Sequence, residues 1–184
     1  MGGTTALYFA FGSNLLTTRL SRRCASARVV ARAAANGYRV AFEKLSEDAS
    51  GKATLVPCEG PSFATGVVYE LSHSDIDALD AFEGPGYRRR KRFPVTCIDT
   101  GQVFVTCTYV ARENVPGLRP YDWYLALILA GLAEHGIDAS HEQSLRMSAY
   151  DVDAQRSRQS RRNALEDLES AGFAGYSELL RSLP

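Results

Sequence analysis

The 184-residue sequence predicts an α+β fold, with about six strands, one helix after the first four or five, and helices at the C-terminal end. Short runs in which apolar and polar residues alternate, separated by turn signals such as Asn36–Gly37, are typical of strands. An apolar helical pattern from Pro120 to His135 follows these runs, and two shorter helical patterns end the chain. Strands that precede helices in this way indicate an α+β arrangement.

Strand signals recur along the first 110 residues. The clearest is the sequence "YRVAF", in which Tyr38, Val40 and Phe42 alternate with Arg39 and Ala41. The turn sequence "DTGQ" joins the last two runs. The runs with strand character cover residues 5–11, 28–34, 38–42, 53–57, 64–71, 87–98 and 102–110.

Two short helices are expected between these strands. The first covers residues 15–22, with Ser13 or Asn14 as its N-cap. The second begins at Ser72 and Asp75, which have the spacing of a capping box, and it ends at the glycine of the sequence "AFEG". Both predictions rest on local signals at the helix ends.

The long helix and the residues after it suggest how the chain is organised. The helix is apolar beyond its core-facing stripe, so we expect neighbours to cover it on two sides. After about residue 152 the sequence becomes polar and basic, and the rest of the chain is too short for a core of its own. We expect one domain over residues 1–152 and a C-terminal helical appendage over 153–184. The stripe consists of Tyr121, Tyr124, Leu125, Ile128, Leu129 and Leu132.

The composition excludes several classes of protein. The chain has 21 Lys and Arg against 21 Asp and Glu, so it lacks the basic excess that is usual in nucleic-acid-binding proteins. No basic N-terminal segment leads into an apolar stretch with a cleavage site, and the longest apolar run, Tyr124–Ala133, falls short of the roughly 20 residues that span a bilayer. We expect a cytoplasmic protein without nucleic-acid or membrane partners, in which the four cysteines stay reduced.

The first candidate site is the sequence "YFAFGSNLLTTRL", where an apolar strand ends at Gly12 and a helix begins. Gly12 has no side chain, so a ligand can approach the backbone closely. The unpaired N–H groups and the partial positive charge of a helix N-terminus favour an anion such as a carboxylate or phosphate. An ordinary turn, in which Ser13 or Asn14 caps its own helix, explains the same residues. The motifs of phosphate loops and serine hydrolases are absent from the sequence.

The second candidate site is Glu83, in the sequence "LDAFEGPGY". In a helix, Ile76, Leu79 and Glu83 share one face, so a carboxylate ends an apolar stripe. Burial and the negative end of the helix dipole both raise the pKa of such a carboxyl, and Asp80 adds like-charge repulsion if it faces the same way. A carboxyl tuned in this way can take up and return a proton near neutral pH. The alternative is that the stripe ends at Phe82 and that Glu83 points into water.

Taken together, "LYFAFGSNLLTTRL" and "LDAFEGPGYRR" resemble the gamma-glutamylcyclotransferase family. The family pattern is a tyrosine-led Y-G-S-N loop, followed much later by a Glu and a Gly at the end of a helix, and the resemblance runs through most of residues 5–150. It implies a small mixed β-barrel flanked by helices. It also implies an enzyme that releases 5-oxoproline from small gamma-glutamyl compounds by internal cyclisation, without metal or organic cofactor. A homodimer is expected on the same ground.

The resemblance also implies roles for individual residues. Glu83 takes the place of the family's catalytic glutamate. Phe11 stands where the family usually has Tyr, so a role that needs a hydroxyl there does not carry over, although the ring can pack in the same way. The backbone of Gly12–Leu15 is expected to hold the gamma-glutamyl carboxylate. The substrate-binding residues that the resemblance implies are Tyr8, Phe11, Gly12, Ser13, Asn14, Leu15, Tyr87 and Tyr124.

Two other interpretations stay open. The basic run "RRRKR", Arg88–Arg92, reads as a solvated edge strand rather than a nucleic-acid-binding surface, because only alternate residues share a face. It is also compatible with an acidic partner or a gamma-glutamylated biosynthetic intermediate, such as an acyl carrier protein that bears a gamma-glutamyl group. The second alternative is a non-catalytic module that binds a gamma-glutamyl or carboxylate ligand without turnover. The presence of Glu83 favours the enzyme.

Overall fold

The computed structural model describes residues 4–60, 62–137, 145 and 147–181. Its centre is a closed barrel of five strands in the order β1-β5-β2-β6-β7. Neighbouring strands pair antiparallel, except that a parallel contact between Tyr8 and Cys107 closes the barrel. A small mixed barrel is the architecture that the sequence resemblance implied. The strands are β1 (Thr5–Ala10), β2 (Arg28–Asn36), β5 (Phe63–Ser72), β6 (Tyr87–Cys97) and β7 (Val103–Ala111).

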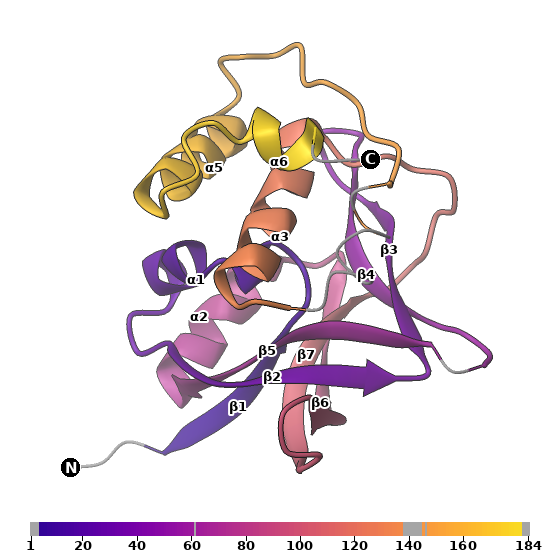
Figure 1. The fold of residues 1–184 in the computed structure, drawn as a ribbon, viewed down its shortest axis with the longest axis vertical. Coiled ribbons are helices and arrows are strands. Elements are labelled where there is room, and N and C mark those ends of the chain that lie inside the picture. Colours follow the sequence, from indigo (N-terminus) through magenta and orange to yellow (C-terminus); the bar gives the residue numbers. More distant parts are fainter. Residues whose placement is uncertain (1–3, 61, 138–144, 146, 182–184) are drawn as a thin grey trace.

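Two further strands, β3 (Tyr38–Leu45) and β4 (Gly51–Pro57), form a ribbon beside the barrel (Figure 1). The backbone N–H of Ala111 in β7 donates to Thr54 Oγ1 in β4 at 2.9 Å, which ties the ribbon to the barrel. The described part of the chain therefore contains seven strands, against the prediction of about six. The ribbon matters for the site because it brings the backbone of β4 against the ends of the barrel strands.

The helices gather on one side of the barrel and above it in Figure 1. Helix α2 begins as the sequence predicted, because Ser72 Oγ accepts a hydrogen bond from the Asp75 N–H at 3.2 Å. Helix α3 is buried along its length as far as Leu132, so it is covered on more than one side, again as predicted. The helices are α1 (Thr17–Arg23), α2 (His73–Glu83), α3 (Asp122–Glu134), α5 (Gln159–Ser170) and α6 (Ser177–Arg181).

The first helix begins later than the sequence predicted. Residues Ser13–Leu15 form a 3-10 turn, η1, and helix α1 starts only at Thr17. No side chain caps either element, so the prediction that Ser13 or Asn14 is an N-cap was wrong. The physical reason is that the Asn14 side chain is buried and bonds the side chains of Tyr8, Arg23 and Glu83 instead.

Helix α3 supports the turn at Ser13–Leu15. Gly131 makes this contact possible, because a Cβ at this position would lie 2.5 Å from Leu15 Cβ and 2.7 Å from the Leu16 backbone nitrogen. From the barrel side, the Tyr69 hydroxyl donates to the Leu15 carbonyl at 2.8 Å. The turn is therefore fixed both by the helix and by strand β5.

The segment after residue 152 packs on helices α1 and α3. Arg19 Nη1 lies 2.9 Å from Asp167 Oδ2, and both side chains are almost fully buried. The Trp123 indole donates to Asp153 Oδ2 at 2.9 Å, and Leu168 joins the main hydrophobic core. These contacts tie the segment closely to the rest of the chain. The division into a domain and an appendage at residue 152 stays a prediction.

The basic run Arg88–Arg92 lies on β6, at an open edge. Strand β6 pairs with β7 along most of its length but with β2 only at Thr96 and Cys97. A register shift between Arg90 and Phe93 interrupts the regular pairing with β7 within this run. The prediction of a solvated edge strand is confirmed for Arg88 and for residues 90–92, which are exposed, whereas the Arg89 side chain is only 20% exposed.

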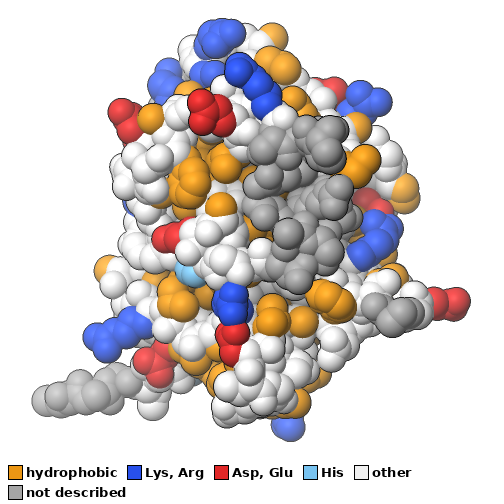
Figure 2. Space-filling model, in the orientation of Figure 1, with side chains coloured by type: hydrophobic (Ala, Val, Ile, Leu, Met, Phe, Trp, Pro, Cys, Tyr) orange, Lys and Arg blue, Asp and Glu red, His pale blue; other side chains and the backbone are white. Residues whose placement is uncertain are grey.

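The surface fits the balanced composition. Figure 2 shows Lys and Arg side chains interspersed with Asp and Glu on one face of the molecule. Within residues 4–181, leaving out the gaps given above, no helix has the length and apolar character needed to cross a membrane.

We predict that Gly131→Ala destabilises the fold by about 1–3 kcal/mol, because the added methyl group overlaps the backbone of Leu16. Chemical denaturation followed by circular dichroism measures the loss. Gly175→Ala is the matched control, since a Cβ there meets only Glu178, at 3.7 Å. Equal unfolding midpoints for the two variants would show that α3 does not need its close approach to the turn.

Candidate active site

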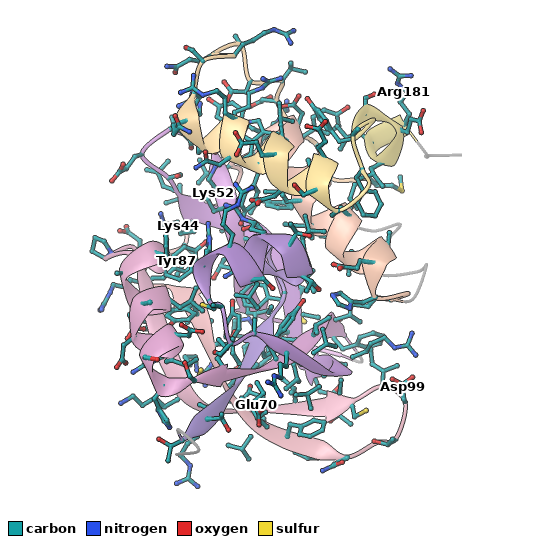
Figure 3. All side chains as sticks on the ribbon, turned by 90° about the vertical axis from the view of Figure 1, so that its left-hand side faces the viewer. Lys44, Lys52, Glu70, Tyr87, Asp99 and Arg181 are labelled. Carbon is teal, nitrogen blue, oxygen red and sulfur yellow. The ribbon has the colours of Figure 1, made fainter. Side chains whose placement is uncertain are left out.

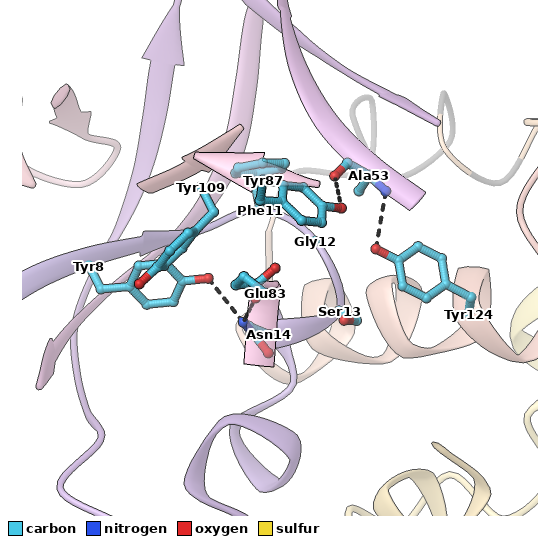
Figure 4. Close-up of a pocket in the computed structure, with 10 residues that line it drawn as sticks. All are labelled: Tyr8, Phe11, Gly12, Ser13, Asn14, Ala53, Glu83, Tyr87, Tyr109 and Tyr124. Carbon is cyan, nitrogen blue, oxygen red and sulfur yellow. Dashed lines mark hydrogen bonds between the residues drawn. The ribbon is translucent and has the colours of Figure 1, made fainter. Parts of the chain in front are cut away.

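One pocket brings the two candidate sites together (Figure 4). It lies where the η1 turn meets the end of helix α2, the start of β6 and the ribbon strand β4. All the site residues that the sequence predicted line it, apart from Leu15. The pocket is lined by Tyr8, Phe11, Gly12, Ser13, Asn14, Ala53, Glu83, Tyr87, Tyr109 and Tyr124.

Glu83, the last residue of α2, points into this pocket. Ile76 and Leu79, the earlier members of its helical face, are buried, whereas Phe82 is 58% exposed. The Glu83 side chain itself is only 15% exposed. Gly84 then ends the helix with φ 68°, a conformation that glycine adopts easily. The interpretation in which the apolar stripe continues to Glu83 is therefore right, and the one in which this carboxylate faces water is wrong.

Burial raises the pKa of the Glu83 carboxyl above its ordinary value, as the sequence predicted. The cations Arg23, Arg19 and Lys44, and a hydrogen bond from Asn14, act on the pKa in the opposite direction. The carboxyl thus lies between a dry environment that favours its protonated form and neighbours that favour its charged form. A group balanced in this way is suited to proton exchange.

Asn14 joins the turn to the acid. Its Nδ2 group donates to Glu83 Oε1 at 3.0 Å and to the Tyr8 hydroxyl at 3.1 Å. Arg23 Nη1 donates to Asn14 Oδ1 at 3.0 Å and lies 3.8 Å from Glu83 Oε1, while its guanidinium covers the Phe82 ring at 5.4 Å. Because arginine has only donors, Oδ1 of the amide has to face Arg23 and Nδ2 has to face Glu83. Arg23 therefore fixes the orientation of the amide.

The backbone of the turn is open. The Leu15 N–H closes the 3-10 turn by donating to the Gly12 carbonyl at 2.9 Å. The N–H groups of Ser13 and Asn14, by contrast, have no hydrogen-bond partner among the residues that the structure describes. Two free donors on consecutive residues beside a buried pocket form a site suited to an anion.

Gly12 keeps the pocket open beside these donors. Its φ of −108° is accessible to any residue, so the backbone conformation does not require glycine. A Cβ at this position would instead lie 3.3 Å from Ala53 Cβ and 3.7 Å from the Tyr124 hydroxyl. A side chain at this position would therefore fill space at the wall of the pocket, and the approach of a ligand to the Gly12 backbone stays a prediction.

Two tyrosine hydroxyls meet at the backbone of Ala53. Tyr87 donates to the Ala53 carbonyl at 2.8 Å, and the Tyr124 hydroxyl accepts from the Ala53 N–H at 3.1 Å (Figure 4). Burial raises the pKa of both phenols above the ordinary value, so both stay protonated at neutral pH. Because Tyr124 is the acceptor in this bond, its own hydrogen remains for another partner.

Leu15 and Phe11, both predicted to bind substrate, differ in how they meet the pocket. Leu15 lies behind the pocket rather than in its wall, with its side chain fully buried and its carbonyl bound by Tyr69. Phe11 lines the pocket with a buried ring that packs on Phe9, with 6.2 Å between ring centroids. The Phe11 ring thus lines the pocket at the position where the family usually has Tyr, and it brings no hydroxyl there.

Three contributors to the site were not predicted from the sequence. Ala53 acts through its backbone, which leaves no signal in residue type. Tyr109 packs against Tyr8 with ring centroids 5.9 Å apart and donates to Asp80 Oδ1 at 2.7 Å, so Asp80 is bound away from the acid. Arg23 reads in the sequence as an ordinary basic residue at the end of a helix.

The cysteines and other possible metal ligands are dispersed. Among the residues that the structure describes, no three His, Cys, Asp or Glu side chains come together in a way that could hold a metal ion. All four cysteines are free thiols in the structure, with Cys24 and Cys97 buried.

Comparison with known proteins points to the family that the two motifs resemble. The family described as "Gamma-glutamyl cyclotransferase, AIG2-like" matches residues 8–125. Proteins named gamma-glutamylcyclotransferase from Bos taurus and Mus musculus are each 30% identical to this chain, over 78% of it and over 78% and 79% of their own lengths. A solved structure named gamma-glutamyl cyclotransferase has a TM-score of 0.78 at 24% identity and covers 89% of this chain and 99% of its own, which supports the fold.

We predict that Arg23→Gln raises the pKa of the Glu83 carboxyl further, because it removes a nearby cation and frees the Asn14 amide to turn. A ¹³C NMR titration of the glutamate side chains measures the change. Arg22→Gln is the matched control, since Arg22 lies on the same helix but pairs with Asp167. An unchanged Glu83 titration in Arg23→Gln, or an equal change in the control, would contradict the role given to Arg23.

Proposed function

Because the chain belongs to the gamma-glutamyl cyclotransferase, AIG2-like family and is an enzyme of this type, we propose that it releases 5-oxoproline from gamma-glutamyl compounds, with Glu83 as general acid and base. The observation that carries the proposal is that the Glu83 carboxyl and the open backbone of the Gly12–Asn14 turn face the same pocket. The turn can bind an anionic group while the acid exchanges a proton a short distance away.

In this proposal the substrate's α-carboxylate binds at the turn. The free N–H groups of Ser13 and Asn14 donate to it, and the space beside Gly12 admits it. Anchoring this end leaves the γ-carbonyl of the substrate near Glu83 and folds the chain back on itself. A ring-closing reaction gains most from such positioning, because the two reacting groups belong to one molecule.

The reaction needs two proton transfers. The substrate's α-amine loses a proton and attacks the γ-carbonyl carbon, which forms the C–N bond of the five-membered ring. The bond from that carbon to the leaving amine then breaks, and the leaving nitrogen gains a proton, so no water or other reactant is consumed. Glu83 takes the first proton and returns it to the leaving nitrogen, which suits a carboxyl whose pKa burial has raised.

Tyr8 is placed to stabilise the oxyanion that develops on the γ-carbonyl. Its hydroxyl accepts from Asn14, and no residue in the described part of the chain accepts its own hydrogen. Burial raises the pKa of this phenol well above its ordinary value, so the hydrogen is present at neutral pH. A donor aimed at such an oxyanion contributes about 3 kcal/mol to the lowering of the barrier.

The pocket encloses about 30 Å³, which is room for about one or two waters. A gamma-glutamyl group is larger, so the lining side chains move apart when it binds. The cytoplasmic location, the homodimer and the independence of metal or organic cofactor that we expect from the sequence are part of the same proposal.

We predict that Glu83→Gln stays folded and lowers the rate of 5-oxoproline release from gamma-glutamyl-alanine by about 10²–10⁴-fold. Glutamine still accepts the bond from Asn14 but cannot carry a proton. Mass spectrometry of the product measures the rate. Asp77→Asn, on an exposed position of the same helix, is the matched control and keeps its activity.

The pH dependence of stability, compared between the wild-type protein and Glu83→Gln, tests the raised pKa of Glu83. Because folding raises the pKa of Glu83, the folded state holds its proton to higher pH than the unfolded chain does. Stability is therefore lost as the pH rises through the folded pKa, and Glu83→Gln lacks this loss.

A folded variant that cyclises at the wild-type rate would remove Glu83 from the mechanism. Ligand binding without release by the wild-type protein would favour the non-catalytic module.

We predict that Gly12→Ala raises KM roughly tenfold or more, because its methyl group takes the space that the substrate carboxylate needs. Steady-state kinetics with gamma-glutamyl-alanine measure KM, and the unfolding midpoint shows whether the fold is kept. A well-folded variant with the wild-type KM would place the carboxylate somewhere other than the turn.

A further inference from the structure

A groove of about 610 Å³ opens beside the pocket. It shares Glu83, Tyr87 and Tyr109 with the pocket, but none of the residues of the Gly12–Asn14 turn lines it. Its walls come from the last turn of α2, the turn after this helix, the start of β6 and the end of β7. The groove therefore reaches the acid without touching the turn.

Positive charge dominates this groove. Arg89 is neutralised, because its Nη1 lies 3.2 Å from Asp80 Oδ2. The side chains of Arg88 and Lys91 have no ion-pair or hydrogen-bond partner among the described residues. Arg112 uses only its Nε, which donates to the Tyr87 carbonyl at 3.1 Å. Three positive charges are thus left for a ligand. They belong to Arg88, Lys91 and Arg112.

Lys44 adds a fourth positive charge next to the groove. Its Nζ lies 5.2 Å above the ring of Tyr87, and Figure 3 shows the two side chains together near the end of α2. It also acts on the pKa of Glu83, in the direction that favours the charged carboxylate. The positive field therefore extends from the groove to the acid.

The second proton transfer of the proposed reaction indicates where the leaving amine lies. Glu83 returns its proton to the leaving nitrogen, so the leaving part of the substrate lies against this carboxyl. In the proposed reaction the gamma-glutamyl part fills the pocket, whose wall includes Ala53 and Tyr124, joined by a hydrogen bond. The groove is the space that remains for the rest of the substrate.

We propose that this groove binds the leaving part of the substrate and selects leaving amines that carry two or more negative charges. The inference rests on the proposed cyclisation. A single carboxylate would neutralise only one of the three free cations, so further negative charge adds contacts. The volume suits a small molecule, since ligand sites of this kind measure about 300–1,000 Å³. Carboxylates and phosphates share the chemistry that arginine and lysine recognise.

A charge series of substrates tests the proposal. The series is gamma-glutamyl-ethylamide, gamma-glutamyl-alanine, gamma-glutamyl-glutamate and gamma-glutamyl-O-phosphoserine, whose leaving parts run from neutral to multiply charged. We expect kcat/KM to rise roughly two- to fivefold with each added negative charge and the rise to shrink at high salt. A kcat/KM for the phosphoserine substrate above the rise expected from its charge alone would indicate a preference for phosphate over carboxylate. A flat or falling series would overturn the proposal.

The variant Arg88→Gln/Lys91→Gln tests whether the preference for negatively charged leaving amines comes from the groove. It removes two cations without described partners, so the fold does not depend on them. We expect the ratio of kcat/KM for gamma-glutamyl-glutamate over gamma-glutamyl-ethylamide to fall towards one. Arg90→Gln/Arg92→Gln removes the same charge from the same strand outside the groove and keeps the wild-type ratio. Equal ratios in the two variants would reject the groove as the source.

Binding without turnover separates this inference from the proposed reaction. NMR titration of the protein with O-phosphoserine, and with alaninamide as the neutral probe, needs no catalysis. Saturable binding of O-phosphoserine that Arg88→Gln/Lys91→Gln abolishes supports the groove even if no substrate is cyclised. If the substrates are turned over but both probes bind equally weakly, the proposed cyclisation stands and the proposed role of the groove is overturned.

Discussion

The side-chain amide of Asn14 is the contact on which the site depends. One amide group joins four parts of the fold, because it bonds Glu83 at the end of α2, Tyr8 in β1 and Arg23 in α1 from its own place in the η1 turn. Both N–H donors and the carbonyl oxygen of the amide are used in one orientation. A buried polar group that is fully satisfied in this way holds its neighbours in a single arrangement. The distance between the turn and the acid therefore follows from this residue.

The turn can hold Asn14 in place because the structure fixes its backbone from two sides. Helix α3 approaches so closely at Gly131 that a methyl group would not fit, and Tyr69 binds the Leu15 carbonyl from the barrel. The N–H groups of Ser13 and Asn14 are the first two of the η1 turn, so no carbonyl of the turn accepts from them. The same packing that stabilises the fold thus creates the free donors of the site.

Much of the site could be predicted from the sequence where the signal is local. The spacing of Ile76, Leu79 and Glu83 offered a buried helical face for the acid, beside the alternative that Glu83 points into water. The function of Asn14 could not be predicted, because capping is a local rule and its real partner, Glu83, lies far along the chain. Nor could the position of Ala53, whose backbone binds two tyrosines without any signal in its side chain. The barrel itself followed from family resemblance, since alternation along strands does not specify which strands pair.

A crystal structure of the protein with 5-oxoproline tests the central claim most directly. We expect the carboxylate of 5-oxoproline to accept hydrogen bonds from the N–H groups of Ser13 and Asn14, and its ring nitrogen to face the Glu83 carboxyl. A complex in which 5-oxoproline occupies this pocket with its carboxylate turned away from the η1 turn, or in which Glu83 points into solvent, would contradict it.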